Sequence, residues 1–438
     1  MYRCGDLSFT IKTTNLIKDS IRDGMQMRAL YLMLVLLFVG SLNADDNWTH
    51  FRGDQAGRAD DAQLPTELGE GKNVKWKIPV RGKGWASPVI FGDQLWTITA
   101  TVDGSKMWAL CFDKNTGETI HDILVFENEE VRFCHPTNSF ASCTPAVEEG
   151  TVYVHFGSYG TAALNTKTGK KIWERRDLEC DHWRGPASSP VIDDDRLIVS
   201  YDGFDVQFVV AFNKETGETV WKKDRGIDYG TDNGDRKKAY STATVIEHQG
   251  RRQAIVPSAM ETISYNPENG EVLWRVRHGG MNAACRPLFH NGLVYITGGD
   301  GARAMVAVSP EGTGDITNTS IKWEFSKSVP RRASQLLIDG HLYMMNDQGV
   351  ASCIQADSGQ VVWQQRAGTG EFRSSPVFAN GFIYCFSVEG AGVVLKAGAE
   401  FEKIADFEFE TGFQASPAIS GNSMFLRSIT HLYCIESE

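Results

Sequence analysis

The sequence lacks any clustering of basic residues. Its 44 Lys and Arg are outnumbered by 55 Asp and Glu, the formal net charge is −11, and no basic stripe appears along the 438 residues. A nucleic-acid-binding surface needs Lys and Arg gathered on one face. We therefore expect no nucleic-acid partner.

Apolar runs long enough to cross a membrane are also missing. The most apolar stretch, residues 29–39, is shorter than the roughly 20 residues that a membrane-spanning helix needs. It is followed by small residues up to Ala44 and then by acidic ones, as is typical of a secretory signal peptide. We predict a signal peptide over residues 1–44 and a periplasmic or secreted protein without a membrane span after cleavage. An uncleaved anchor is the alternative, and the polar residues before Met25 leave the role of that N-terminal extension open.

The sequence has nine cysteines but no spacing that supplies a disulfide framework. Cys111 and Cys353 stand where other copies of the repeat described below have a small residue, so we expect them to be buried. Cys134 and Cys143 flank a loop and are the best candidates for a disulfide in an exported chain.

Common catalytic motifs are absent. The sequence contains no Gly-x-Ser-x-Gly elbow, no His-Glu-x-x-His zinc helix and no phosphate-binding Gly-Lys-Ser/Thr loop. We predict no catalytic residue and no metal site. His135 and His182 lack metal-ligand spacing, so structural hydrogen bonding is expected for both. Asp202 and Asp205 are an acidic pair that supports only a weak hypothesis, hydrolysis or lyase action on a polysaccharide.

What the sequence does contain is a repeat. Its 43 glycines against 14 prolines predict many turns, and a short phrase around a glycine recurs at roughly 40 to 55 residues. Each repeat must bury its apolar face against its neighbours. The phrase occurs at Asp113–Glu118, Asn165–Lys170, Asn213–Glu218, Asn266–Glu271 and Asp357–Gln360. The tryptophans that follow it, or match it elsewhere, are Trp76, Trp173, Trp221, Trp274, Trp323 and Trp363, and we predict that they hold neighbouring repeats together.

Each repeat opens with Ser-Pro or a related pair, followed by alternating apolar strands. The eight openings are Ala86–Val89, Cys143–Ala146, Ser188–Val191, Ser241–Thr244, Cys285–Leu288, Ala333–Leu336, Ser374–Val377 and Ala415–Ala418. Four antiparallel strands per repeat define a propeller blade.

The eighth opening is followed by too few residues for a complete blade. The segment Val74–Ile78 matches the tryptophan-bearing outer strands and has no repeat of its own, so pairing it with the last blade would close the ring and remove an exposed edge. We therefore predict an all-β, eight-bladed β-propeller of four-stranded antiparallel blades over residues 74–438, with the last blade completed by an N-terminal strand. Residues 45–73 form the arm by which the chain enters it.

The repeated Thr-Gly-Glu-x-x-Trp phrase, from Val74 to the C-terminus, resembles the pyrroloquinoline-quinone (PQQ) repeat of quinoprotein dehydrogenases and of outer membrane assembly factor propellers. Trp48–Gly53 resembles the segment that precedes the ring in exported bacterial PQQ-repeat propellers. The resemblance implies the fold strongly and the activity weakly. If the chain were a dehydrogenase of this kind, the resemblance would also imply two adjacent cysteines above the quinone and a set of oxygen-bearing side chains that bind Ca²⁺. No adjacent cysteines occur here and that set does not map onto this sequence, so we expect no cofactor; a PQQ- and Ca²⁺-dependent oxidoreductase is the alternative.

Propeller topology predicts where a ligand would bind. The loops between blades and the loops between second and third strands share one face, which becomes the candidate face for a protein, peptide or polysaccharide partner. Its predicted residues are His135, Asn138, Asp181, His182, Arg184, Asp202, Asp205, Tyr240, Arg286, Asp300, Arg303, Arg331, Asp347 and Arg373. The arginines can bind a carboxylate, sulfate or phosphate through their forked donors, or they can pair with the acids at blade junctions.

Overall fold

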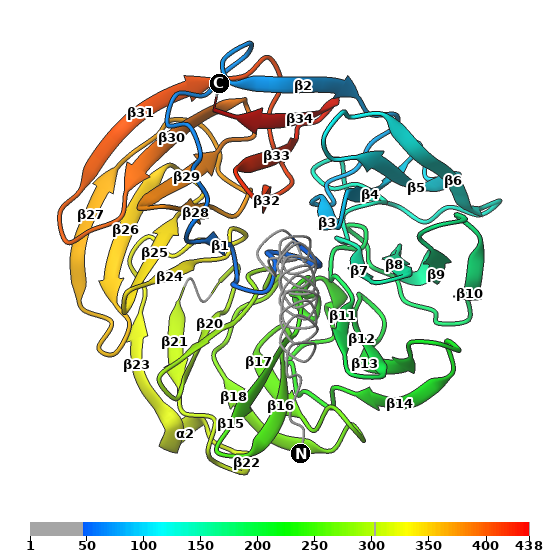
Figure 1. Ribbon diagram of the computed structural model, residues 1–438. Coiled ribbons are helices and arrows are strands. Elements are labelled where there is room, and N and C mark those ends of the chain that lie inside the picture. Colours follow the sequence, from blue (N-terminus) through cyan, green and yellow to red (C-terminus); the bar gives the residue numbers. More distant parts are fainter. Residues whose placement is uncertain (1–46, 302–303, 438) are drawn as a thin grey trace, which may run out of the picture. The chain divides into compact units, whose positions relative to one another are not determined.

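A ring of eight sheets is the architecture of the compact unit Asp45–Glu438 (Figure 1). The computed structural model describes residues 47–301 and 304–437. The predicted signal peptide and Arg303 lie outside the described residues. Within them, no helix is both long enough and apolar enough to cross a membrane.

The first four blades follow one another along the chain, each with its strands in sequence order from the centre of the ring outward. Blade 1 comprises β3 (Val89–Phe91), β4 (Gln94–Ala100), β5 (Lys106–Asp113) and β6 (Thr119–Glu127). Blade 2 comprises β7 (Ala146–Glu148), β8 (Thr151–His155), β9 (Thr161–Asn165) and β10 (Lys171–Arg175). Blade 3 comprises β11 (Val191–Asp193), β12 (Arg196–Asp202), β13 (Gln207–Asn213) and β14 (Thr219–Asp224). Blade 4 comprises β15 (Thr244–His248), β16 (Arg251–Pro257), β17 (Glu261–Tyr265) and β18 (Val272–Arg277).

The last four blades continue around the ring. Blade 5 comprises β19 (Leu288–His290), β20 (Leu293–Thr297), β21 (Met305–Val308) and β23 (Ile321–Phe325). Blade 6 comprises β24 (Leu336–Ile338), β25 (His341–Met345), β26 (Val350–Gln355) and β27 (Val361–Arg366). Blade 7 comprises β28 (Val377–Ala379), β29 (Phe382–Phe386), β30 (Ala391–Lys396) and β31 (Glu402–Glu408). Blade 8 comprises β32 (Ala418–Ser420), β33 (Ser423–Arg427), β34 (His431–Glu436) and β2 (Val74–Pro79).

Two short segments extend blades beyond four strands. β1 (Arg58–Ala59) pairs in parallel with the inner strand β28, and β22 (Gly314–Asp315) pairs in parallel with the outer strand β18. The described helices are all short: η2 (Gly157–Tyr159), η3 (Gly234–Arg236) and α2 (Thr317–Ser320).

The ring closes between β2 and β34, as predicted. The strands run antiparallel, with Trp76 opposite Cys434 and Ile78 opposite Leu432. An N-terminal strand therefore completes the blade that begins near the C-terminus, and the eighth sheet keeps no incomplete edge.

The tryptophans and glycines of the repeated phrase meet across blade boundaries. The indole of Trp173 donates to Lys214 O at 2.8 Å, and its ring covers Gly217, where an added Cβ would lie 2.7 Å from the indole. Trp221 and Gly270 meet in the same way. Trp76, Trp323 and Trp363 donate to Lys114 O, Ala356 O and Gly398 O, in each case on the next blade. Trp274 differs, because it donates within blade 4 to Gln253 Oε1 at 2.6 Å.

Seven of the eight blade openings place a Ser or Thr hydroxyl in an inner ring of hydrogen bonds around the central channel. In this inner ring, a backbone N–H on one blade donates to the Ser or Thr hydroxyl of the next. The bonds run from Ser87 to Thr144, Thr144 to Ser189, Ser189 to Thr242, Arg286 to Ser334, Ser334 to Ser375, Ser375 to Ser416 and Ser416 to Ser87, at 2.9–3.0 Å. Blade 5 interrupts the ring, because Arg286 occupies the hydroxyl position and its side chain has no acceptor.

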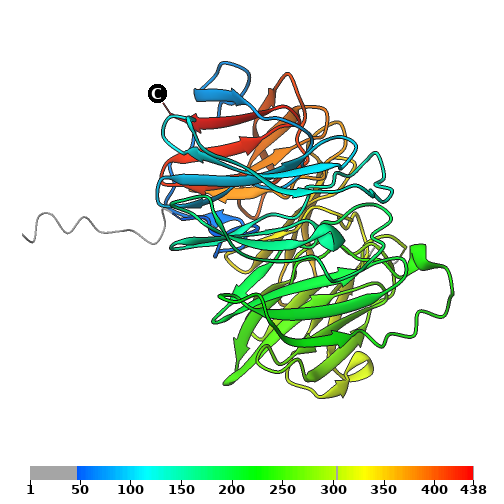
Figure 2. The ribbon, with the colours of Figure 1, turned by 90° about the vertical axis from the view of Figure 1, so that its right-hand side faces the viewer.

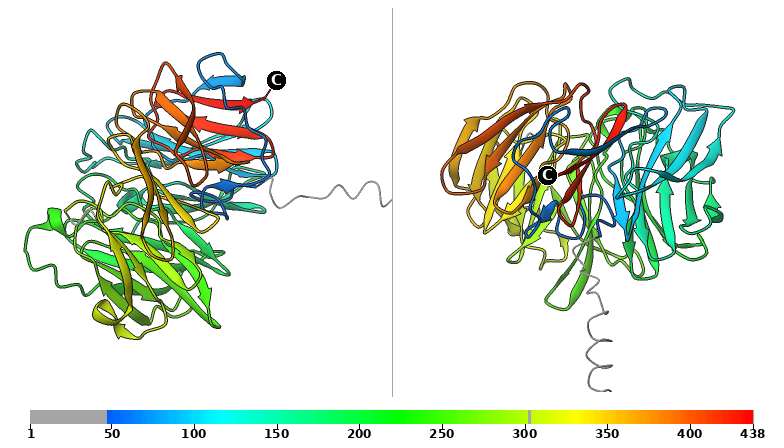
Figure 3. Two further views of the ribbon diagram at one scale, coloured as in Figure 1. Left: turned by 90° about the vertical axis from the view of Figure 1, so that its left-hand side faces the viewer. Right: turned by 45° about the horizontal axis from the view of Figure 1, so that its top comes forward.

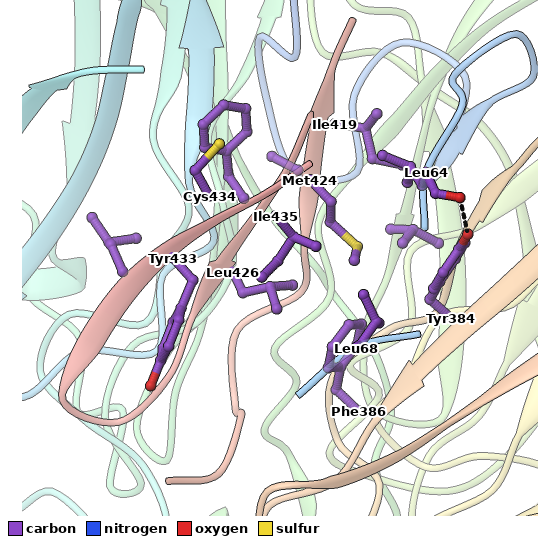
Figure 4. Packing of buried hydrophobic residues seen from close by; sticks show 14 of the residues in the cluster. Leu64, Leu68, Tyr384, Phe386, Ile419, Met424, Leu426, Tyr433, Cys434 and Ile435 are labelled. Atoms are coloured by element: carbon purple, nitrogen blue, oxygen red, sulfur yellow. Dashed lines mark hydrogen bonds between the residues drawn. The ribbon is translucent and has the colours of Figure 1, made fainter. Parts of the chain in front are cut away.

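The apolar core lies between adjacent blades. Figure 4 shows the part formed by blades 7 and 8, where Leu64 and Leu68 of the arm lie among Tyr384, Phe386 and Met424, and the Tyr384 hydroxyl donates to Leu64 O at 3.3 Å. The arm thus contributes to the core rather than only leading into it.

The cysteines do not form the disulfide considered above. Cys134 and Cys143 are both free, as are the other six cysteines of the described part of the chain. The Cys134 thiol contacts Arg184 O at 3.5 Å, whereas Cys143 is fully buried beside an inner strand. Cys111, Cys353 and Cys434 are also fully buried, and burial raises the pKa of Cys353 to about 11.

Candidate functional site

A pocket of about 180 Å³ opens at the centre of the ring, on the face that carries the loops between blades. Figures 2 and 3 show η3 projecting on this side, whereas the blue N-terminal arm lies toward the opposite side. Of the predicted residues, Asn138, Arg184, Tyr240, Asp300, Arg331 and Arg373 line the pocket. The two sets of loops meet here, because Arg331 on a between-blade loop contacts Asp300 and Asp347 on second-to-third loops.

The pocket wall repeats with the blades. In every blade, the residue two positions before the Ser, Thr or Arg of the inner ring lines the pocket. These residues are Trp85, Ser142, Ala187, Tyr240, Ala284, Arg332, Arg373 and Gln414. In an extended backbone, residues two positions apart point their side chains to the same side. The same two-residue spacing therefore places both the inner ring of hydrogen bonds and the pocket wall. Of these eight, the predicted set contains only Tyr240 and Arg373, and this two-residue spacing is the sequence signal that would have found the other six.

The floor of the pocket is Phe51, on the N-terminal arm. The arm crosses the channel: Trp48 pairs with Ile90 of β3, and the backbone of Gly57 bonds to Phe378 of β28. Arg286, the exception in the inner ring, donates to Phe51 O at 2.6 Å. The pocket is therefore closed at its inner end by the arm.

Two buried arginines hold the arm in place. Arg52 is 1% exposed and donates to Pro376 O at 2.9 Å and to Gln335 O at 3.0 Å. Burial, with the nearby charge of Arg286, lowers the pKa of Arg52 to about 9, and burial lowers that of Arg286 to about 10. Both remain protonated at neutral pH. Arg286 was predicted on the ligand face, but its side chain is used to hold the arm beneath the pocket.

Arginines concentrate on the wall formed by blades 6 and 7. Arg331 Nε donates to Asp347 at 2.7 Å, and Arg373 forms a fork to Glu371 at 2.7 and 2.9 Å. The hydrogen bond from Arg373 is the main cause that holds the pKa of Glu371 below its usual range. Arg332 lies at 3.5 Å from both carboxylates, so its guanidinium is held loosely between them. Arg331 and Arg373 are thus engaged by acids, and Arg332, which contacts the two carboxylates only through Nη1, is the most weakly engaged arginine of this wall.

A second cationic group lies across the pocket. Arg184 is 3.7 Å from Asp235, and the buried Lys238 also contacts Asp235. His135 stands at the rim, where its Nδ1 is 2.8 Å from Thr137 Oγ1. Burial, followed by the charges of Arg184, Lys238 and Arg373, holds the pKa of His135 below its usual range, so its imidazole is neutral at pH 7.

Three residues that line the pocket carry buried polar atoms that are unpaired within the described structure. These atoms are the donors Trp85 Nε1 and Arg184 Nε and the acceptor Asn282 Oδ1. The side chain of Asn282 is turned by a bond from its Nδ2 to Asp300 at 3.1 Å, which leaves the oxygen free. Because an unpaired buried polar group costs about 1–3 kcal/mol, such atoms mark places where a ligand or water supplies the missing bond.

Several predicted residues serve the fold instead. Asp202 is buried and receives two bonds from Arg225, at 3.0 and 2.6 Å, and one from Ser258 at 3.0 Å. Burial raises the pKa of Asp202 against the opposing charge of Arg225. Asp205 accepts from two backbone N–H groups, of Asp181 and Val206. The bonds of Asp202 to Arg225 and Ser258, and of Asp205 Oδ1 to the backbone, are therefore structural ones.

His182 and Asp181 also shape the loop. The Nε2 of His182 accepts from Ser158 N at 3.2 Å, and burial lowers the pKa of its imidazole to about 4. Asp181 accepts from Trp183 N at 2.8 Å and thereby sets the turn that carries Arg184 into the pocket.

The Ca²⁺ of a quinoprotein would need several free oxygen ligands. The acids beside the pocket, Asp300, Asp347 and Glu371, are all paired with arginines. Within residues 47–301 and 304–437, no group of three or more His, Cys, Asp or Glu side chains is placed to hold a metal ion.

The sequence is similar to a known family and to several known proteins. A family model described as outer membrane protein assembly factor BamB matches residues 60–206 and 205–438. Tetrathionate hydrolase of Acidithiobacillus ferrooxidans is 21% identical over 72% of this chain and 64% of its own length. BamB of Moranella endobia is 23% identical over 42% of this chain and 48% of its own. Quinoprotein alcohol dehydrogenase PedH of Pseudomonas putida is 30% identical over 30% of this chain and 22% of its own. The chain thus spans less than two thirds of each of these relatives.

Solved structures share the ring. BamB from Moraxella catarrhalis superimposes with a TM-score of 0.59 at 13% identity, over 83% of this chain and 97% of that one. Quinohemoprotein alcohol dehydrogenase from Comamonas testosteroni superimposes with a TM-score of 0.63 at 11% identity, over 90% and 81%. At these identities the likeness concerns the fold alone.

Proposed function

Because the chain belongs to the family of the outer membrane protein assembly factor BamB, whose blades are PQQ repeats, we propose that it is a non-catalytic binding propeller. Its ligand face is the one that carries the between-blade loops, and its partner is a protein or peptide. We further propose that it works in the periplasm or outside the cell, after removal of residues 1–44.

The observation that carries this proposal is the pocket itself. It is walled on opposite sides by cations, Arg332 and Arg373 against Arg184, and closed below by Phe51. Rigid donors around a shallow, closed cavity favour the capture of an anionic group from a partner, because arginine forks match carboxylate geometry. The carboxylates nearby are neutralised by the same arginines, so the proposal assigns no acid or base to the pocket.

A polysaccharide partner stays an alternative, and so does quinone-dependent oxidation. The specific observation that favours oxidation is the 30% identity to PedH over 140 residues. We propose instead that the chain functions without PQQ or Ca²⁺. The pairing of Asp300, Asp347 and Glu371 with arginines supports this proposal.

Site-specific photo-crosslinking tests the ligand face. A photoreactive amino acid would replace Thr137 or Arg236 on the between-blade face, and Glu215 or Glu268 in the Thr-Gly turns of the opposite face as controls. In cells that produce the protein, we expect crosslinked adducts from the first pair and few or none from the second. Equal adducts from both faces, or none from either, would contradict the proposal.

Titration with PQQ and Ca²⁺ tests the alternative. A ligand that binds only the folded state raises the melting temperature. We expect no shift and no reduction of a dye in the presence of an alcohol. A shift accompanied by dye reduction would replace the binding proposal by the oxidoreductase.

A further inference from the structure

We infer that the pocket receives the C-terminal carboxylate of an extended peptide, and that the apolar side chains preceding this carboxylate lie on an aromatic shelf formed by Phe133, Trp183 and Phe204. This inference rests on the proposed function and names the ligand of the same face.

The shelf is an exposed cluster of aromatic rings. Phe133 is 54% exposed, Trp183 41% and Phe204 37%. Their ring centroids are 5.1 Å apart for Phe133 and Trp183 and 5.6 Å apart for Trp183 and Phe204, so the three form one surface. Val206, two residues after Phe204, is also exposed, at 39%. Contiguous exposed apolar surface of this kind marks an interaction site.

The backbone holds the shelf in place. Trp183 has a φ of 56°, in the left-handed region that a bulky residue rarely adopts. Its N–H donates to Asp181 Oδ1, and Phe204 N donates to Asp181 O at 2.6 Å, which joins the two loops. Gly234 lies against Phe204, where an added Cβ would be 2.3 Å from Phe204 O. The left-handed backbone of Trp183 costs free energy and leaves the indole exposed to solvent, without a benefit to the fold. This combination points to a role of the indole in binding.

The shelf is joined to the pocket along the chain. Trp183 is followed directly by Arg184, which lines the pocket, so their Cα atoms are about 3.8 Å apart. On the other side, Phe133 leads through His135 to Thr137 and the pocket wall. A ligand that covers the shelf therefore lies beside residues that line the pocket.

The unpaired atoms of the pocket match the end of a peptide. A terminal residue offers a carboxylate, which accepts hydrogen bonds, and an amide N–H, which donates one. Trp85 Nε1 and Arg184 Nε are unpaired donors, and Asn282 Oδ1 is an unpaired acceptor on a side chain that is 8% exposed. Capture of a terminal carboxylate by hydrogen-bond donors is a recurring mode of peptide recognition.

The closed floor excludes a chain that passes through. Phe51 and the arm block the inner end, and the volume of about 180 Å³ is below the roughly 300–1,000 Å³ that enclose a whole drug-sized ligand. A chain terminus fits such a space. The shelf favours a peptide over a saccharide, because its neighbouring rings are inclined at 53° and 34° and present no common plane for stacking sugar rings.

Random peptide pools test the inference. The purified chain from Asp45 onward would be immobilised and exposed to N-acetylated random hexapeptides with free C-terminal carboxylates, to the same pool as C-terminal amides, and to oligogalacturonates. Retained molecules would be quantified by mass spectrometry. We expect the free-acid pool to be retained about tenfold more than the amides, with apolar side chains enriched near the terminus.

Variants with matched controls assign the effect to the site. Trp183→Gly removes the ring at a position where the backbone already suits glycine, so the fold is preserved. Arg332→Gln removes a pocket donor. Each should lower free-acid retention about tenfold. The controls are Ile172→Ser, an exposed apolar residue of β10, and Arg252→Gln, whose side chain is 33% exposed against 32% for Arg332 but pairs with Asp193 on blade 3.

The outcomes separate this inference from the proposed function. Equal retention of acids and amides, or no retention of either, overturns the inference, and crosslinks from Thr137 and Arg236 would then still support the proposed face. Preferred retention of oligogalacturonates overturns it in favour of an acidic saccharide. Failure of both the crosslinks and the peptides would overturn both proposals.

Discussion

Replacing Asp202 by Asn tests whether this carboxylate belongs to the fold or to a reaction. The side chain is 0% exposed and its partner Arg225 is 1% exposed. Arg225 binds both carboxylate oxygens and also donates to Val256 O at 3.0 Å, on the next blade. Removing one member of such a pair leaves the other charge buried without its counter-ion, which costs about 3–5 kcal/mol. Against a total stability of about 5–15 kcal/mol, this loss is large.

Urea unfolding measures the loss through the midpoint and slope of the transition. Asp205→Asn is the matched control, because its Oδ1 accepts only from backbone N–H groups and the amide oxygen can still do so. We expect the control to lose less than about 1 kcal/mol. The double variant Asp202→Leu with Arg225→Met removes both charges, and it should recover most of the loss.

The reasoning is refuted if Asp202→Asn costs under about 1 kcal/mol, since a desolvated charge pair cannot be that weakly coupled. It is also refuted if the variant keeps its stability but abolishes cleavage of a polysaccharide. That result would restore the acidic pair as catalytic residues.

Three further predictions concern the blade junctions and the buried histidines. Trp221→Phe loses the bond to Pro267 O at 2.9 Å and should lower the free energy of unfolding by about 1–3 kcal/mol; an unchanged urea midpoint would contradict the role of the indole. Gly270→Ala should cost more than the 1–2 kcal/mol of a left-handed residue, because φ is 71° and the new Cβ would lie 2.7 Å from Trp221; a stabilised variant would disprove this. Burial lowers the pKa of His155 from 6.5 to about 3, so its contribution is complete above pH 6.5 and is lost as the pH falls towards 3, by about 2 kcal/mol at pH 5. His155→Leu should therefore make stability less dependent on pH between 7 and 5, and an unchanged dependence would rule out this titration.

The blade count and the closure of the ring could be predicted because they depend on local chemistry. Gly217 needs a left-handed φ of 75°, and Trp173 needs a flat partner without a side chain. Because these requirements recur in each repeat, they appear in the sequence as a regular spacing of glycines and tryptophans. The sequence likewise shows that the last blade lacks a fourth strand after Ala418 and that one strand, at Val74, has no blade of its own.

The site was only partly predictable. Asn138, Arg184 and Arg373 were placed on the ligand face and line the pocket, whereas Asp202 and Arg286 were placed there and serve the fold. Loop topology gives the face on which a residue lies. It does not give the direction of the side chain, which depends on partners that are distant in sequence.

The all-β ring, its eight blades and the strand that closes it follow from the sequence alone, because each depends on turn geometry and on apolar alternation within about 50 residues. Which acids are buried with arginines, which polar atoms remain unpaired and what closes the channel depend instead on the tertiary fold. Arg52 meets Pro376, and Arg286 meets Phe51, across more than 200 residues of chain. Such contacts form only when the ring has formed. Only then are these groups buried, and burying a charge or an unpaired polar atom costs free energy.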